Sequence, residues 1–164
     1  MSAQLVDSLH EAGAISDLDR CFARLMARLS GSGDGAVTLA AALTSRASAE
    51  GDICLDLARL AGGSISAGEP AFRCPDLEPW VRSLRKSAVV GAPGDWRPLV
   101  LDGTRLYLHR HWDAEQSLVR FLWERSQVPA PGVDMARLRE GIGRLFPGGN
   151  GGRTGRGWRR PRPS

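Results

Sequence analysis

Two histidines one residue apart, His109 and His111, are the first candidates for chemistry in this sequence. On a strand both imidazoles would point to the same face, which is a geometry that a metal pair can use. The third histidine, His10, is distant in sequence, and no cysteine or carboxylate stands at a spacing that completes a ligand set. We therefore predict no metal site and interpret the pair as a solvated or interface-facing feature.

Patterns for nucleophilic, acid–base and nucleotide chemistry are also missing. No G-x-S-x-G elbow is present. Asp113 and Glu115 fall in the first turn of a predicted helix, where the helix dipole explains them. The glycine-rich C-terminal segment lacks the lysine of a P-loop, and no apolar strand leads into it. The sequence predicts neither a catalytic residue nor a cofactor site in this chain.

The formal net charge of +4 is concentrated at the C-terminus, where residues 148–164 contain five arginines and no acid. Without those arginines, 17 basic residues stand against 18 acidic ones, so the rest of the chain is close to neutral. The segment can be a disordered, solvated end, or it can hold nucleic acid by charge with help from an aromatic side chain. In the second interpretation the non-specific contacts are Arg153, Arg156, Trp158, Arg159, Arg160 and Arg162.

The cysteines and the N-terminus indicate a cytoplasmic protein. Cys21, Cys54 and Cys74 form no C-x-x-C pair, which suits a reducing compartment. Residues 1–14 have acids where a signal peptide is basic, and we expect a flexible leader there. The longest apolar stretch, residues 36–43, is far shorter than the roughly 20 residues of a membrane helix, so no membrane association is expected.

Apolar spacing and capping residues predict helices over residues 16–29, 36–47, 76–90, 112–126 and 134–145. Ser16 caps the first helix and Asp34 the second, which is rich in small apolar residues and is expected to be buried. Inward-facing residues are assigned to the first helix (Ile15, Leu18, Phe22, Leu25, Leu29), the third (Trp80, Val81, Leu84), the fourth (Leu118, Val119, Leu122, Trp123) and the last (Met135, Leu138, Ile142, Leu145). Of Trp80, Trp96, Trp112 and Trp123, the sequence does not separate those in the core from those on the surface.

Extended segments are predicted in two places. Ile53, Leu55 and Leu57 alternate with polar neighbours and indicate a short strand that runs into a helical turn, followed by a loop over residues 61–70. Residues 98–110 predict a β-hairpin around Asp102 and Gly103, with a type I′ turn. The expected fold class is therefore α+β, mainly α: a small helical, winged-helix-like domain with one β-hairpin.

Three segments together resemble a known family. They are VTLAAAL (residues 37–43), GDICLDL (51–57) and PLVLDGTRLYLHRHW (98–112) followed by Glu115. In this order they are similar to the N-terminal region of the alpha subunit of exodeoxyribonuclease V, RecD. Leu145, Phe146 and Pro147 resemble the segment just before that family's motor. The resemblance covers residues 15–147, so we expect one domain over this range. Residues 148–164 are expected to form a disordered tail.

The resemblance implies a DNA-repair role. The family's alpha subunit is an ATP-dependent 5′-to-3′ helicase that works with beta and gamma subunits in double-strand-break repair and recombination. Its N-terminal domain is expected to be non-catalytic and to dock the motor onto the gamma subunit. ATP and magnesium belong to the motor of the full-length family, and no residue that binds them can be carried over here. We interpret residues 148–164 as the product of a frameshift or a fragmentary gene, which reading the downstream DNA in the other frames would test.

Two functional hypotheses follow from the sequence. The first is a docking domain that binds the beta and gamma subunits, gamma foremost, and reaches DNA only through the complex. Its expected partner-binding residues are Arg105, Tyr107, His109, Arg110, His111 and Trp112. The second is a small nucleic-acid-binding protein that uses a winged-helix-like body and the arginine-rich tail. The near-neutral body favours docking, because a DNA-reading domain usually carries a basic face of its own.

Overall fold

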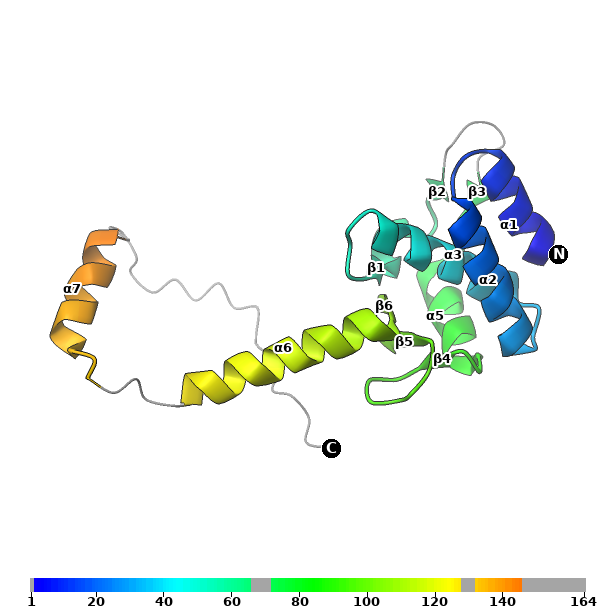
Figure 1. Cartoon of the computed structure of the whole chain (residues 1–164). Coiled ribbons are helices and arrows are strands. Elements are labelled where there is room, and N and C mark those ends of the chain that lie inside the picture. Colours follow the sequence, from blue (N-terminus) through cyan, green and yellow to red (C-terminus); the bar gives the residue numbers. More distant parts are fainter. Residues whose placement is uncertain (1, 66–71, 128–131, 146–164) are drawn as a thin grey trace. The chain divides into compact units, whose positions relative to one another are not determined.

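The computed structural model describes residues 2–65, 72–127 and 132–145, with side chains described from residue 4 (Figure 1). The chain divides into two compact units, the first ending at Glu115 and the second beginning at Gln116. Each unit is treated by itself. The predicted class, α+β and mainly α, is confirmed. The likeness to a winged helix stays a prediction.

The N-terminal segment is part of the folded first unit. Helix α1 (Ser2–Glu11) packs against α2 (Asp17–Ser30) and α3 (Gly35–Ala49). Val6 and Leu9, one helical turn apart, have no exposed surface. The expectation of a flexible leader over residues 1–14 is therefore wrong, because these two side chains are part of the hydrophobic core.

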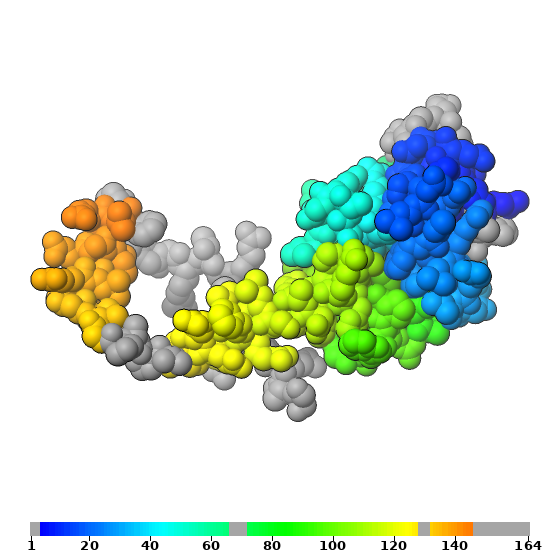
Figure 2. Space-filling model, viewed as in Figure 1, coloured from blue at the N-terminus to red at the C-terminus, as the bar shows by residue number. Residues whose placement is uncertain are grey.

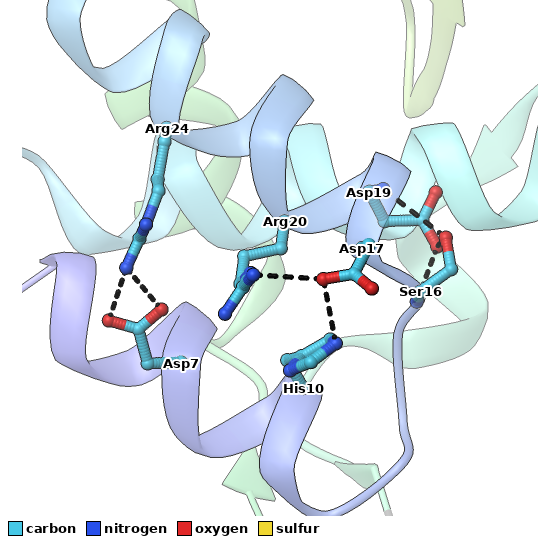
Figure 3. Close-up of polar contacts among 7 residues, drawn as sticks. All are labelled: Asp7, His10, Ser16, Asp17, Asp19, Arg20 and Arg24. Atoms are coloured by element: carbon cyan, nitrogen blue, oxygen red, sulfur yellow. Dashed lines mark hydrogen bonds and ion pairs between the residues drawn. The ribbon is translucent and has the colours of Figure 1, made fainter.

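Polar contacts hold α1 to α2 at the surface (Figure 3). Arg24 donates to both carboxylate oxygens of Asp7 at 2.5 and 2.7 Å, a bidentate pairing that constrains orientation as well as distance. Asp17 Oδ1 lies 3.2 Å from His10 Nε2 and 2.8 Å from Arg20 Nη2. The Asp7–Arg24 and His10–Asp17 contacts join the two helices, whereas the Asp17–Arg20 contact lies within α2.

Helix α2 begins with the predicted Ser16 cap. The Ser16 hydroxyl accepts a hydrogen bond from the Asp19 backbone N–H, and the Asp19 side chain accepts one from the Ser16 backbone N–H at 2.9 Å, so the cap is a reciprocal capping box. Asp19 is buried by this arrangement. Gly31 ends the helix with a φ of 66°, a conformation that glycine adopts without strain.

The buried face of α2 differs from the predicted one. The residues turned to α3 are Ala23 and Met26, whereas Leu18, Leu25 and Leu29 are 69%, 40% and 56% exposed. Helices α2 and α3 pack against each other, and α3 contributes Ala40, Ala41 and Ala42 to the core. The capping box also turns Asp19 inward and thereby the larger leucines outward. The predicted core face is therefore wrong for three of its five members.

Helix α3 is the centre of the first unit, as its composition predicted. Asp34 caps it, with its carboxylate accepting from the Ala36 backbone N–H at 2.8 Å. Ten of its residues are buried, and it contacts α1, α2, α5 (Leu77–Lys86), β1 (Leu55–Asp56) and β6 (Arg105–Leu108). The Trp80 indole N–H of α5 donates to the Ala36 carbonyl at 2.9 Å, and Ser83 donates to Asp34. One end of α3 is thereby bonded to α5.

A four-stranded sheet also packs against α3, with strand order β1-β6-β5-β4. β4 (Val90–Gly91) runs parallel to β5 (Leu99–Asp102), and the other pairs are antiparallel. β1 leads directly into α4 (Leu57–Leu60), which confirms the predicted strand and helical turn. Helix α5 stops at Lys86, four residues before its predicted end, because Val89 and Val90 turn into the extended backbone that enters β4.

The predicted loop over residues 61–70 begins with a strand instead. β2 (Ser64–Ile65) pairs antiparallel with β3 (Phe72–Arg73) in a second, two-stranded sheet. The Cys74 backbone N–H also donates to the Gly63 carbonyl at 2.8 Å, which extends this pairing. Residues 66–70 of the predicted loop lie outside the described residues.

The hairpin over residues 98–110 is confirmed, but its turn is displaced by one residue. Asp102 pairs with Arg105, so the two loop residues are Gly103 and Thr104. Gly103 has a φ of 63°, and no described residue other than glycine has a positive φ. A type I′ turn needs a positive φ at both central residues, so that prediction is wrong; glycine at the first loop position is instead the signature of type II′.

Helix α6 (His109–Gln127) starts three residues earlier than predicted, immediately after β6, and continues into the second unit. In that unit the side chains expected in the core are largely exposed, namely Leu118 (57%), Leu122 (49%) and Trp123 (44%). Helix α7 (Met135–Leu145) is capped by Asp134, and its predicted stripe Met135, Leu138, Ile142 and Leu145 is also exposed. Within the described ranges, none of the helices combines the length and apolar content that crossing a membrane requires.

Candidate partner-binding surfaces

The predicted partner-binding residues occupy the end of the hairpin and the first turn of α6, but they do not form one surface. Arg105 and Arg110 are exposed, whereas His109, His111 and Trp112 are half-buried. Tyr107 is only 3% exposed. It therefore cannot present its side chain to a partner, and its assignment to a docking surface is corrected here.

Tyr107 is buried because β6 is covered on both faces. Leu106 points into the main core, while Tyr107 and its cross-strand partner Val100 lie on the opposite face of the sheet. Burial raises the pKa of Tyr107 to about 12, with further contributions from the nearby Cys54 and Glu115, while a hydrogen bond with Arg105 acts in the opposite direction. Burial likewise raises the pKa of the Cys54 thiol. The Tyr107 phenol and the Cys54 thiol are therefore both neutral at ordinary pH, and we assign them a structural role.

His109 and His111 contact different residues of the first unit. Because they lie on a helix and not on a strand, a spacing of two residues turns them roughly 200° apart. The His109 ring meets Trp96 edge to face, with ring centroids 4.5 Å apart. His111 Nε2 lies 2.8 Å from the Ser48 hydroxyl at the end of α3. The same-face geometry expected of a metal pair is therefore wrong, and no group of three metal-ligating side chains occurs among the described residues.

The contact between Ser48 and His111 has the residue types of a nucleophile and its base. Such a pair needs a third group that orients the base, usually a carboxylate. The neighbour observed instead is Arg110, which donates to the Ser48 hydroxyl at 3.3 Å and lies 3.4 Å from His111 Nε2. A cation in that place opposes the build-up of positive charge on the imidazole. The contact is better explained as an anchor that holds the first turn of α6 to α3.

An exposed apolar stripe on α2 is a feature that the sequence placed in the core. It consists of Leu18, Leu25 and Leu29, with Cys21 exposed and Phe22 half-buried between them, at spacings of three and four residues; we call it the α2 stripe. A row of leucines on one helix face is the pattern that a second helix or an apolar groove covers. Singly scattered exposed leucines need no explanation, whereas leucines that recur on one helix face are a candidate interaction surface.

Trp96 is the other conspicuous surface residue. It is 90% exposed, whereas Trp80 is fully buried, Trp112 half-buried and Trp123 44% exposed. The loop that carries Trp96 joins β4 to β5 and contains Pro93 near its start and Pro98 at its end. The sequence offered one usable sign of this exposure, which is that proline, glycine and aspartate surround the tryptophan and leave it no apolar periodicity. The predicted nucleic-acid contacts Arg153, Arg156, Trp158, Arg159, Arg160 and Arg162 lie outside the described residues.

The fold and its surfaces define a small α+β domain built around one alanine-rich helix, with apolar and aromatic side chains left on its exterior. Residues 11–107, more than half of the chain, match the family model described as RecBCD enzyme subunit RecD, N-terminal domain. The chain belongs to this family.

Curated relatives agree with the family model. The chain is 30% identical over 138 residues to proteins named RecBCD enzyme subunit RecD from two strains of Mycobacterium tuberculosis, CDC 1551 / Oshkosh and H37Rv, with 82% of this chain and 23% of the relative covered. It is 38% identical over 85 residues to the protein of the same name from Mycolicibacterium smegmatis, covering 52% of this chain and 14% of the relative. The chain thus spans less than a quarter of the length of the curated relatives it matches.

Proposed function

We propose that this chain is a non-catalytic docking domain of a RecD-like subunit, which binds the other subunits of a RecBCD (exodeoxyribonuclease V) complex in the cytoplasm. In this role it contributes to double-strand-break repair and recombination without hydrolysing ATP itself. The gamma subunit is its expected direct partner, with the beta subunit second, and DNA is reached through the complex.

The observation that carries this proposal is the α2 stripe. Leu18 and Leu29 are more than half exposed on a helix whose neighbouring face, with Ala23 and Met26, is buried. Fully burying a fully exposed leucine is worth about 1.5–3 kcal/mol. Because Leu18, Leu25 and Leu29 are 69%, 40% and 56% exposed, covering each of them would gain a part of that amount. A partner surface that covers the stripe would remove this apolar area from water.

Co-purification with the partner subunits tests the proposal. The full chain is co-expressed with the beta and gamma subunits, and retention is compared for wild type, Leu29→Asp and Ile53→Asp. Ile53 is a matched control because it is 55% exposed, close to the 56% of Leu29, and lies outside the stripe. We expect retention of wild type and Ile53→Asp and loss of Leu29→Asp. Equal retention of both variants would exclude the stripe, and no retention of wild type would exclude docking altogether.

The alternative function is a small nucleic-acid-binding protein, and the arginines of residues 148–164 favour it. Lys and Arg contacts with phosphates release counterions, so such binding weakens steeply as salt rises. This alternative predicts affinity for DNA that collapses when residues 148–164 are deleted and subunit binding that is absent with or without them. Fluorescence anisotropy of a labelled oligonucleotide at two salt concentrations measures the first quantity.

A further inference from the structure

Helix α7 does not have the composition of a helix that is stable by itself. It is 11 residues long and contains Gly141 and Gly143, and glycine has the lowest helix propensity after proline. Isolated helices shorter than about 12–15 residues are marginal in water even when their sequences favour the helix. Most of the stability of such a helix comes from packing an apolar face against another element. Helix α7 therefore needs a packing partner.

The apolar face of α7 is narrow and regular. We call it the α7 stripe, and its members are Met135 (56% exposed), Leu138 (44%), Ile142 (51%) and Leu145 (70%). They follow one another at spacings of three, four and three residues. This alternation is the a and d pattern with which one helix packs lengthwise along another. The α7 stripe therefore fits a second helix that carries the same spacing.

Helix α6 carries such a face within the same second unit, which begins at Gln116. Leu118, Phe121 and Leu122 are 57%, 52% and 49% exposed, and none of the described residues of α6 is buried. The Arg125 guanidinium lies 5.4 Å from the centroid of the Phe121 ring, and an arginine in this position can lay its aliphatic stem along an apolar surface. Leu118, Phe121 and Arg125 thus repeat at three and then four residues. Figure 2 shows the surfaces of both helices, with the end of α6 in yellow and α7 in orange.

We propose that α6 and α7 close into an antiparallel helical hairpin, in which the α7 stripe covers the apolar face of α6. Helix α6 ends at Gln127 and α7 begins at Met135, which leaves the seven residues 128–134 between them. Connections of about 2–8 residues join helices that lie side by side in opposite directions. In opposite directions the two spacings coincide in three layers, which are Leu118 with Leu145, Phe121 with Ile142, and Arg125 with Leu138.

The α7 of the same chain is the favoured occupant of the α6 face because it is tethered next to it. A short connection holds a tethered segment at an effective concentration in the millimolar range, which a second copy or a separate protein does not reach at ordinary concentrations. In the closed hairpin both apolar faces are removed from water. Helix α7 then acts as a strap that closes the α6 face to other partners. This inference does not depend on the proposed docking function, which the α2 stripe of the first unit supports.

Disulfide cross-linking of the full chain tests the hairpin and its register. All variants carry Cys21→Ser, which removes the exposed native cysteine. Phe121→Cys with Ile142→Cys should form an intrachain disulfide on mild oxidation, and mass spectrometry of proteolytic fragments from the monomer identifies it. Phe121→Cys with Ala136→Cys is the matched control, because Ala136 lies about 120° around the helix from Ile142 and outside the α7 stripe. The control pair should stay reduced.

Circular dichroism measures whether α7 depends on this packing. Leu138→Asn and Arg137→Asn replace two neighbouring helix formers of nearly equal propensity by the same residue, one inside the α7 stripe and one outside it. Leu138→Asn should lose the far-ultraviolet signal of the 11 residues of α7 and abolish the disulfide between positions 121 and 142. Arg137→Asn should keep both, since its ion pair with Asp134 is exposed and contributes little.

A disulfide between positions 121 and 142 in the monomer, lost with Leu138→Asn and kept with Arg137→Asn, is the expected result. The absence of this disulfide, or equal cross-linking of the control pair, would refute the hairpin. Equal helix signals for Leu138→Asn and Arg137→Asn would refute the dependence of α7 on the α6 face. The same disulfide found only between two chains would assign the α6 face to a second copy and overturn the intrachain closure. None of these results involves the beta or gamma subunit, so the hairpin can fail while the docking function stands, and the reverse.

Discussion

Alanine substitutions on two neighbouring faces of α2 test directly which face of this helix is buried. Met26 is 2% exposed and contributes to the core against α3, whereas Leu18 is 69% exposed. Replacing a buried methionine by alanine removes its packing and leaves a cavity, which costs about 2–5 kcal/mol. Less than a third of Leu18 is covered, so its contribution is below about 1 kcal/mol, and the higher helix propensity of alanine offsets part of that.

Urea unfolding measures both variants. Far-ultraviolet circular dichroism follows the helices, and tryptophan fluorescence adds the buried Trp80 as a core probe. We expect Met26→Ala to lower the free energy of unfolding by about 2–5 kcal/mol and Leu18→Ala by less than about 1 kcal/mol, with unchanged slopes against denaturant. The helical periodicity of the sequence alone predicts a large loss for Leu18→Ala. Equal losses, or a larger loss for Leu18→Ala, would refute the assigned face and remove the basis of the α2 stripe.

Three further predictions concern the same unit. Leu9→Ala should lower the free energy of unfolding by about 2–5 kcal/mol because Leu9 is fully buried. Gln4→Ala, on the exposed side of α1, should leave the free energy of unfolding unchanged. An unchanged value for Leu9→Ala would support the original prediction of a flexible leader. Trp80→Phe should cost about 1–3 kcal/mol in urea unfolding, since the Ala36 carbonyl loses its indole donor and the smaller ring leaves space. Tyr107 is the chain's single tyrosine, so absorbance of the tyrosinate reports its pKa directly, and titration near 10 would contradict its burial. Because the folded-state pKa is raised to about 12, the stability that the neutral phenol provides is complete below the unfolded value of about 10 and is lost as the pH rises towards 12; Tyr107→Phe should flatten this decline.

The sequence predicted local structure where one residue type carries the signal. Ser16 and Asp34 marked two helix starts correctly, and the alanine-rich segment after Asp34 became the buried α3. The hairpin followed from alternating apolar residues, but its turn moved by one position because the strand register pairs Asp102 with Arg105. Register depends on how β6 packs between β1 and β5, which a turn dipeptide does not encode.

The buried face of a helix was harder to predict from the sequence than the positions of the helices and strands. On α2 the leucines made the stronger apolar stripe, yet the buried residues are Asp19, Ala23 and Met26. The capping box turns Asp19 inward, and Ala23 and Met26 follow it at spacings of four and three residues on the same helix face. His109 and His111 changed from a strand to a helix, which separated two side chains that the sequence placed together. Trp96 carried no pattern of its own, and its exposure follows from the tertiary path of its loop.

The burial of α3 has a mechanical consequence. With Val37 1% exposed, Leu39 2% exposed and Ala40 to Ala42 fully buried, this helix touches the α1 and α2 layer on one side and α5 with the sheet on the other. Its alanines set how far apart the two layers stand, and Asp34 and Ser48 bond its two ends to α5 and α6. Helix α3 therefore acts as a spacer of set width, and any larger residue at Ala40, Ala41 or Ala42 would widen the gap.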